Sequence, residues 1–422
     1  SQPTPTEGLK FLRTYPTRPL FAHVTGYYSI VFGRAGLERS YNSALTGGGG
    51  VLTMQDLGDR LLSRGERGDT VVLSIHSKVQ EAAAKALGAR RGAVVAVDPL
   101  TGDVLANVSS PSFDPDQLSS HDAKAIRATW EALQADPNKP LLNRAVAESY
   151  PPGSTFKIVV AAAALEHGRG PETAFAPTDH YLPAQTAKPI GNFGGRACGG
   201  NMLEAFRASC NVYFARLGAE LPEGALADVA SKFGFGEAPP VELRAAASRI
   251  PSDNELASPA FAAQASIGQF NVSATPLQMA LVAAGVASGG KIPAPRLVSE
   301  VRDARGGKVE RTQPEVWKQA ISAPTSAVLT ALMEAVVADG TGKAAAIPGV
   351  RVAGKTGTAQ TGREGQPPHA WFVAFAPADA PRIAVAVVVE NGGDVGNEAT
   401  GGRVAAPIAK QVLEAHRAVA VW

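Results

Sequence analysis

Three short motifs supply the residue types needed for acyl transfer through a serine. They are Ser154 with Lys157, Ser209 with Asn211, and a Lys-Thr-Gly-Thr run at 355–358. A serine hydroxyl is a weak nucleophile until a base takes its proton, and a lysine with a lowered pKa can be that base. The seven histidines stand in no motif with a serine. Together the motifs predict a nucleophile with its base, a proton relay and a clamp for a carboxylate.

The first two motifs have rivals elsewhere in the chain, which are Ser288 with Lys291, Ser40 with Asn42, and Ser252 with Asn254. Two glycines follow Ser288 and prolines come soon after, so no helix can hold that pair one turn apart. Ser154, in contrast, follows a Pro-Pro-Gly turn and opens an apolar run that predicts a helix ending at Gly168. Residues three apart on a helix share a face, so Lys157 can reach the Ser154 hydroxyl. An N-cap role for Ser154 is the alternative, but it leaves the downstream lysine motif unexplained.

Each remaining polar residue of the motifs is given a role by its chemistry. The positive charge of Lys355 would lower the pKa of Lys157 if both line one cleft, and the amino-terminal end of the helix would add to this effect. Ser209 would relay a proton to the leaving amine. Asn211 would orient Lys157 and bind the substrate amide. The identity of the acylating base is disputed for this kind of site, and Lys157 is the prediction.

The Lys-Thr-Gly-Thr run is predicted to bind the substrate. The backbone N–H groups of Ser154 and Thr358 would form an oxyanion hole, in which one donor contributes about 3 kcal/mol. Lys355, Thr356 and Thr358 would meet a terminal carboxylate, and Gly357 belongs to the same binding strand. A lysine on a strand could instead simply face solvent. Two buried-looking strands follow it at 370–377 and 383–390, which favours a place within a packed sheet.

Composition excludes several other classes of function. The net charge is +2 without a basic run, which gives no indication of nucleic-acid binding. Neither a metal-ligand spacing nor a cofactor motif is present, so we expect no metal and no cofactor. Cys198 and Cys210 flank a short helical segment, and Cys210 is the middle residue of the Ser-x-Asn motif. They could form a disulfide, worth roughly 3 kcal/mol, or remain two buried thiols. The sequence leaves both open.

The order of predicted elements indicates an α/β fold in two domains. Residues 1–68 lack the motifs and end in a charged turn at 63–69, so they are predicted to be a non-catalytic domain, with 69–422 as the catalytic domain. After a strand and a helix at 71–87, two apolar strands at 92–98 and 103–109 form a hairpin. Residues 154–287 are mostly helical, and strands return before a final helix at 404–418. We therefore expect a central antiparallel sheet with a helical subdomain, and the active site at their junction.

The chain resembles the class B penicillin-binding proteins, which are monofunctional peptidoglycan transpeptidases. Besides the three motifs, the resemblance rests on segments 94–106, 111–115, 150–157, 266–269 and 274–280, and on residues 15–16, 23–28 and 36–42 of a short amino-terminal pedestal. In the family, the Ser-x-Asn motif lies upstream of an Ile-Gly-Gln segment and before a helix that contains aromatics. This selects Ser209 over Ser252.

The resemblance implies a function, partners and a location. Ser154 would be acylated by a stem peptide ending in D-Ala-D-Ala, and an amine from a neighbouring stem would take the acyl group. β-Lactams would trap the acyl-enzyme. The family also implies a single amino-terminal anchor outside this sequence, action outside the cytoplasmic membrane, and partnership with a membrane glycosyltransferase. The alternatives are a D,D-carboxypeptidase or β-lactamase-type hydrolase, and a β-lactam-sensing receptor domain.

Overall fold

A computed structural model describes residues 1–4, 9, 11–47, 68–420 and 422. Residues 63–67, which make up most of the predicted boundary turn, therefore lie outside the described residues. In the part of the chain that is described, none of the helices combines the length and the apolar character that a membrane crossing requires.

The centre of the molecule is a five-stranded antiparallel sheet assembled from distant parts of the chain. Its strands, in spatial order, are β16 (Ala353–Ala359), β17 (His369–Ala376), β18 (Ile383–Val389), β6 (Gly92–Val97) and β7 (Val104–Ser110). The predicted hairpin near 92–109 and the two late strands are confirmed. The strand that carries Lys355, β16, lies at one edge of the sheet.

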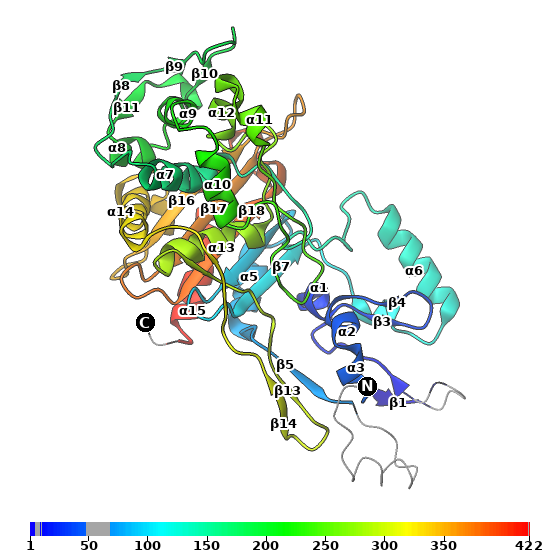
Figure 1. Ribbon diagram of the computed structural model, residues 1–422. Coiled ribbons are helices and arrows are strands. Elements are labelled where there is room, and N and C mark those ends of the chain that lie inside the picture. Colours follow the sequence, from blue (N-terminus) through cyan, green and yellow to red (C-terminus); the bar gives the residue numbers. More distant parts are fainter. Residues whose placement is uncertain (5–8, 10, 48–67, 421) are drawn as a thin grey trace.

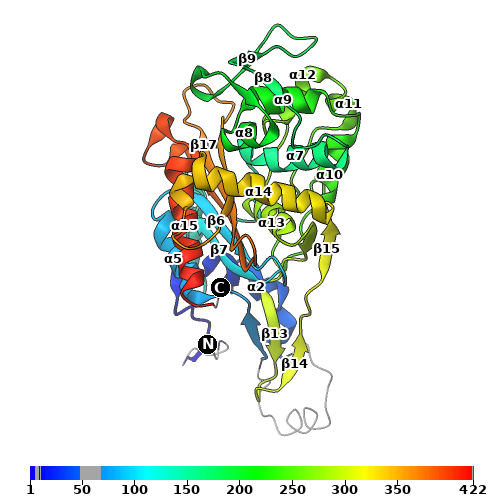
Figure 2. The same cartoon turned by 90° about the vertical axis from the view of Figure 1, so that its left-hand side faces the viewer.

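Helices cover both faces of this sheet (Figures 1 and 2). Alternate residues of a strand point to opposite faces. Accordingly, Val94 belongs to the core under α5 (Ser77–Leu87) and α15 (Ala406–Arg417), whereas Val95 belongs to the larger core that includes α13 (Pro276–Ala287). Because both faces are covered, β6 and β18 are buried along their whole length, which explains their uninterrupted apolar sequences.

The second layer beyond α13 is the predicted helical subdomain, which Figure 1 shows above the sheet. Its helices are α7 (Lys157–Glu166), α8 (Met202–Arg207), α9 (Asn211–Ala219), α10 (Ala225–Lys232), α11 (Asp253–Leu256) and α12 (Pro259–Ala265), and α14 (Ala323–Asp339) joins them to β16. The sequence did not predict the small strands between α7 and α8, which are β8 (Phe175–Thr178), β9 (His180–Tyr181), β10 (Ile190–Gly191) and β11 (Cys198–Gly200). They are too short to show an alternating pattern.

The amino-terminal segment packs beside a later helix. Its described elements are β1 (Gln2–Pro3), β2 (Phe11–Leu12), α1 (Ala22–Thr25), β3 (Tyr28–Ser29), β4 (Gly33–Arg34), α2 (Gly36–Ser40) and α3 (Asn42–Leu45). Tyr27 and Phe32 contact Trp130 of α6 (Ala123–Ala135), with ring centroids 6.1 and 4.5 Å apart. Figure 1 shows α6 beside β3 and β4, away from the central sheet. These aromatic contacts tie the first 47 residues to the remainder of the chain.

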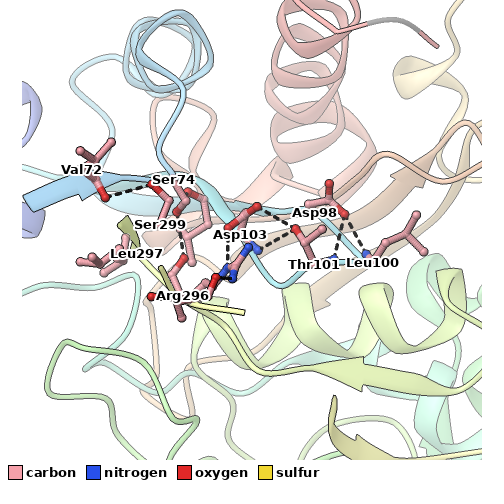
Figure 3. A network of polar contacts seen from close by, with 12 residues as sticks. Val72, Ser74, Asp98, Leu100, Thr101, Asp103, Arg296, Leu297 and Ser299 are labelled. Carbon is pink, nitrogen blue, oxygen red and sulfur yellow. Dashed lines mark hydrogen bonds and ion pairs between the residues drawn. The ribbon is translucent and has the colours of Figure 1, made fainter. Parts of the chain in front are cut away.

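A smaller sheet extends away from the main body. It consists of β5 (Thr70–Leu73), β13 (Val298–Arg302) and β14 (Lys308–Arg311), and a separate pair is β12 (Lys291–Pro293) with β15 (Val316–Gln319). Figure 2 shows β13 and β14 projecting below the core. At the base of this sheet, Arg296 Nε donates to Asp103 Oδ1 over 2.7 Å, and Ser74 Oγ donates to the Arg296 carbonyl over 2.9 Å (Figure 3). This polar network anchors the small sheet to the β6–β7 hairpin.

Candidate active site

Ser154 lies in a single turn that precedes the helix predicted for it. A 3-10 turn spans Gly153–Phe156, and α7 begins only at Lys157 and ends at Glu166. The prediction of one helix from Ser154 to Gly168 was therefore too long at both ends. Both the N–H and the hydroxyl of Thr155 donate to the Pro152 carbonyl, at 3.3 and 2.7 Å, which tightens the chain before the α-helix starts. Ser154 stays half-buried, and the residues after it are buried.

The turn is clamped against a second segment of the helical subdomain. Gly153 adopts a φ of 52°, and its N–H donates to the Gly268 carbonyl over 3.1 Å. A Cβ on Gly268, where φ is 70°, would lie 2.0 Å from the Gly153 carbonyl oxygen. No other residue fits there. The close contact explains why the Ile-Gly-Gln segment belongs with the nucleophile turn.

Lys157 is fully buried and is held by the Ser-x-Asn motif. Its Nζ donates to the Ser209 carbonyl and to Asn211 Oδ1, each over 2.7 Å. Burial, and secondarily the charge of Lys355, hold the pKa of Lys157 well below its usual value. A neutral amine has two hydrogens and one lone pair. In the neutral form of Lys157 both hydrogens have these acceptors, which leaves the lone pair to accept a proton.

Lys355 is also fully buried, so the alternative of a solvent-facing lysine on a strand is wrong. Its Nζ donates to Ser209 Oγ over 2.8 Å and to the Thr356 carbonyl over 3.1 Å. Burial lowers the pKa of Lys355 to about 7. Among the described residues, neither lysine forms an ion pair with a carboxylate, so no opposite charge offsets their desolvation.

Ser209 and Asn211 are held in place by a residue that the sequence analysis missed. Ser209 adopts a φ of 57°, which is uncommon for a residue with a side chain. Asn211 opens α9, and Asn192 Oδ1 accepts from the N–H groups of Asn211 and Val212 over 3.0 and 3.1 Å. Asn192 Nδ2 donates to the Thr178 and Arg196 carbonyls. Asn192 therefore caps α9 from a loop, and no motif in the sequence signals this contact.

The same loop is tied to the motif covalently. Cys198 and Cys210 form a disulfide with their Cα atoms 5.8 Å apart, so of the two states that the sequence left open the structure contains the bonded one. The bond joins β11 to the middle residue of the Ser-x-Asn motif. The described residues contain no cluster of three or more His, Cys, Asp or Glu side chains that could hold a metal ion.

Strand β16 passes directly against the nucleophile turn. A Cβ on Gly357 would lie 2.9 Å from the Pro152 carbonyl oxygen and 3.0 Å from Trp371 Cβ, and one on Gly153 would lie 2.9 Å from the Thr358 carbonyl oxygen. Thr358 is half-buried. Thr356 is buried, and its hydroxyl lies 2.6 Å from the hydroxyl of Thr341. The three motifs thus meet where the sheet joins the helical subdomain. Hydrogen bonds join Lys157, Ser209, Asn211 and Lys355, and the turn that carries Ser154 packs against β16.

This combination of fold and site is that of a serine acyltransferase. Comparison with known families identifies the family to which the chain belongs. The family model of the penicillin-binding protein transpeptidase domain matches residues 92–414, and that of the penicillin-binding protein A dimerisation domain matches residues 1–71. The chain therefore belongs to the penicillin-binding protein transpeptidases, in class B.

Among its relatives is the peptidoglycan D,D-transpeptidase PbpA of Mycolicibacterium smegmatis, 42% identical over 97% of this chain and 85% of that protein. The peptidoglycan D,D-transpeptidase FtsI of Escherichia coli is 31% identical over 94% of this chain and 65% of that protein. The penicillin G acyl-enzyme of penicillin-binding protein A from M. tuberculosis superposes with a TM-score of 0.89 at 38% identity, over 98% of this chain and 96% of that one. Its ceftriaxone acyl-enzyme gives 0.91, also at 38% identity, over 98% and 94%. The resemblance stated from the motifs is confirmed.

Proposed function

We propose that this chain is a peptidoglycan D,D-transpeptidase that works through an acyl-enzyme at Ser154 and is blocked covalently by β-lactams. The observation that carries the proposal is the fully buried Lys157, three residues after the half-buried Ser154, whose Nζ donates to the Ser209 carbonyl and to Asn211 Oδ1. Burial and the charge of Lys355 hold the pKa of this lysine well below its usual value. The transpeptidase relatives and the β-lactam acyl-enzymes of similar structures support it.

In the acylation step, Lys157 Nζ takes the proton of Ser154 Oγ while Oγ bonds to the carbonyl carbon of the penultimate D-Ala. Negative charge develops on the carbonyl oxygen. The backbone N–H groups of Ser154 and Thr358 would bind it, and such a donor is worth about 3 kcal/mol when it is preorganised. The closeness of Gly153 to the Thr358 carbonyl supports this pairing of turn and strand.

The leaving amine then needs a proton. The C–N bond to the terminal D-Ala breaks, and the nitrogen takes the proton of Ser209 Oγ, which Lys355 can replenish across their 2.8 Å contact. Lys355 and Thr358 are proposed to meet the terminal carboxylate, together with the backbone of Thr356 and Gly357. The Thr356 hydroxyl can join them when Thr341 is the donor of the contact between the two hydroxyls, because the hydrogen of Thr356 is then free to bind the carboxylate.

An amine of a neighbouring stem peptide completes the transfer by reversing these proton movements. Water is the competing acceptor, and a hydrolase needs a group that activates it. Within the described residues, no carboxylate hydrogen-bonds to Lys157, Ser209 or Lys355. This favours slow deacylation, as a transpeptidase requires, over the carboxypeptidase or β-lactamase alternative.

The arrangement of the chain supports further proposals about its surroundings. We propose residues 1–68 as a non-catalytic interaction domain and 69–422 as the catalytic domain, because the two family models divide the chain in this region. The peptidoglycan substrate named for the relatives lies outside the cytoplasmic membrane. We also propose a single amino-terminal anchor and a membrane glycosyltransferase partner, in line with the family resemblance.

The test is the intact mass of the protein after incubation with benzylpenicillin, with Ser154→Ala as the control. A stable adduct of one drug on the wild type alone is the expected result, and a D-Ala-D-Ala donor with a D-amino acid acceptor should then give the exchanged peptide. A transient adduct would indicate a hydrolase. A stable adduct without peptide exchange would indicate a receptor. The absence of any adduct would overturn the proposal.

A further inference from the structure

A buried charge cluster lies outside the three motifs, at the end of β18. The Glu390 carboxylate is 7% exposed, and its Oε1 accepts from Arg144 Nε over 2.7 Å and from the Tyr150 hydroxyl over 2.8 Å. Its Oε2 pairs with Arg91 over 2.6 Å. Arg144 is fully buried, and its other nitrogens donate to the carbonyls of Asn138 and Lys139. The proposed reaction uses none of these groups.

Tyr150 connects the cluster to the nucleophile, because it lies four residues before Ser154. Its backbone N–H and C=O both bond to Ala274, at 3.0 and 2.8 Å, and the next carbonyl, of Pro151, accepts from Trp371 Nε1 over 3.0 Å. The Tyr150 ring packs edge-on against the ring of Trp371, with centroids 6.1 Å apart. The segment that enters the nucleophile turn is therefore held along its backbone and also at the tip of the tyrosine.

The chemistry of the Glu390 carboxylate suits this restraint. Arg144 keeps the pKa of Glu390 below its usual value although burial acts to raise it, so the group remains an ionised acceptor. Hydrogen bonds to an ionised acceptor are shorter and stronger than those between neutral groups. Tyr150 donates to it, and the tyrosine stays protonated because burial and the Glu390 charge raise its pKa.

We propose that Glu390 and Tyr150 are positioning residues for Ser154. The Tyr150 hydroxyl, bound to Glu390 at the end of β18, fixes the segment that leads into the turn, and so fixes Ser154 Oγ relative to Lys157 and β16. The inference rests on Ser154 being the nucleophile of the proposed function. Misplacing a reacting atom by about 1 Å can cost on the order of a hundredfold in rate. A small increase in the movement of Ser154 Oγ would therefore slow the chemical step.

The experiment measures acylation of the wild type and of Tyr150→Phe by a fluorescent penicillin, separating the acylation rate constant from the dissociation constant of the first complex. Tyr150→Phe removes one hydroxyl and leaves the Glu390–Arg144 pair intact, so the variant should fold. We expect the rate constant to fall by about tenfold, as loss of positioning predicts, with the dissociation constant unchanged. The rate constant of Glu390→Gln should fall further than that of Tyr150→Phe. Glu390→Gln weakens the acceptor of the Tyr150 hydroxyl and also leaves Arg144 without its carboxylate. The double variant should lose less than the product of the two single losses, because both changes act on the same hydrogen bond.

Asp103→Asn is the matched control, because it breaks another carboxylate–arginine pair attached to the same sheet, Asp103 with Arg296 (Figure 3), far from the nucleophile turn in sequence. It should lower the unfolding midpoint and leave the acylation rate constant unchanged. A folded Tyr150→Phe with the wild-type rate constant would overturn the proposal. The proposal would also be overturned if Tyr150→Phe and Asp103→Asn lost equal stability and Tyr150→Phe lost no more of the acylation rate constant than Asp103→Asn. If the wild type itself forms no adduct, the proposed function fails first.

Discussion

The side-chain nitrogen of Lys157 lies 2.7 Å from Asn211 Oδ1 and is fully buried. The amide oxygen can only accept, so the lysine is the donor. This contact fixes the position of the Lys157 nitrogen, while burial and the charge of Lys355 hold the pKa of Lys157 well below its usual value.

The rate of acylation should depend on pH as a bell-shaped curve. Activity requires Lys157 neutral, so the rate should rise with pH through the lowered pKa of that lysine. Carboxylate binding requires Lys355 protonated, so the rate should fall again above about pH 7. The profile of the rate constant divided by the dissociation constant reports the free enzyme. In Lys355→Ala the rising limb should move to higher pH, because the charge that helps to lower the pKa of Lys157 is gone. A rising limb that stays in place would contradict the assignment.

Stability should also depend on pH through the two lysines. The folded state lowers both pKa values, so between the folded and unfolded values the unfolded chain binds more protons, and the free energy of unfolding rises with pH. Each such lysine contributes a slope of about 1.4 kcal/mol per pH unit within that range. Urea unfolding at pH 7 and pH 9 should therefore show a smaller rise for Lys157→Met than for the wild type. Equal rises would mean that Lys157 is charged in the folded state.

Asn192 should matter although it belongs to no motif. Asn192→Ala removes the cap of α9, which costs about 1 kcal/mol of stability, and it loosens Asn211 and the Ser209 carbonyl around Lys157. We expect acylation to slow by about tenfold, as misplacement of the base predicts. Asn192→Asp keeps the acceptor for the α9 N–H groups but places a carboxylate oxygen against the Thr178 and Arg196 carbonyls. Because the cap is retained, this variant should keep more of the rate than Asn192→Ala. Equal losses in the two variants would show that the cap is not the important contact.

Gly357→Ala should separate β16 from the nucleophile turn. The added methyl would lie 2.9 Å from the Pro152 carbonyl oxygen, and overpacking of this kind typically costs about 1–3 kcal/mol. Chemical unfolding would give the loss of stability, and fluorescent penicillin would give the loss of acylation. The nearby exposed Gly362, where a Cβ meets nothing within 4 Å, provides the control. Gly362→Ala should leave the acylation rate unchanged. The positive φ of 73° at this position strains an alanine, but the strain affects only the loop.

Much of the fold follows from patterns that act locally. The strands at 92–97, 104–110, 369–376 and 383–389 are apolar runs bounded by turns, and the sequence predicts them within two residues. The choice of Ser154 and Lys355 also needs only local context, whereas the choice of Ser209 over Ser252 rests on the family resemblance. The burial of Lys355 could not be predicted, because it depends on how distant segments pack. A lysine on a strand has the same sequence pattern whether it faces solvent or a cleft.

The residues that the sequence analysis missed act through contacts between distant segments. Asn192 reaches α9 from a loop 19 residues away, and Glu390 reaches Tyr150 across 240 positions. An asparagine in a loop and a glutamate after an apolar strand are both common, so neither has a distinguishing signal. The start of α7 was misplaced for a related reason. The 3-10 turn at Ser154 depends on Gly153 packing against Gly268, which local helix propensity does not include.

Strand β16 is the last strand of the sheet and, among the described strands, pairs only with β17. The backbone groups of a sheet edge can hydrogen-bond to an added extended chain. A stem peptide lying along this edge would be recognised through hydrogen bonds of its main chain. These bonds would not depend on its side chains. Selectivity for the stem would then come from the two ends of that contact, the carboxylate at Lys355 and the carbonyl at Ser154.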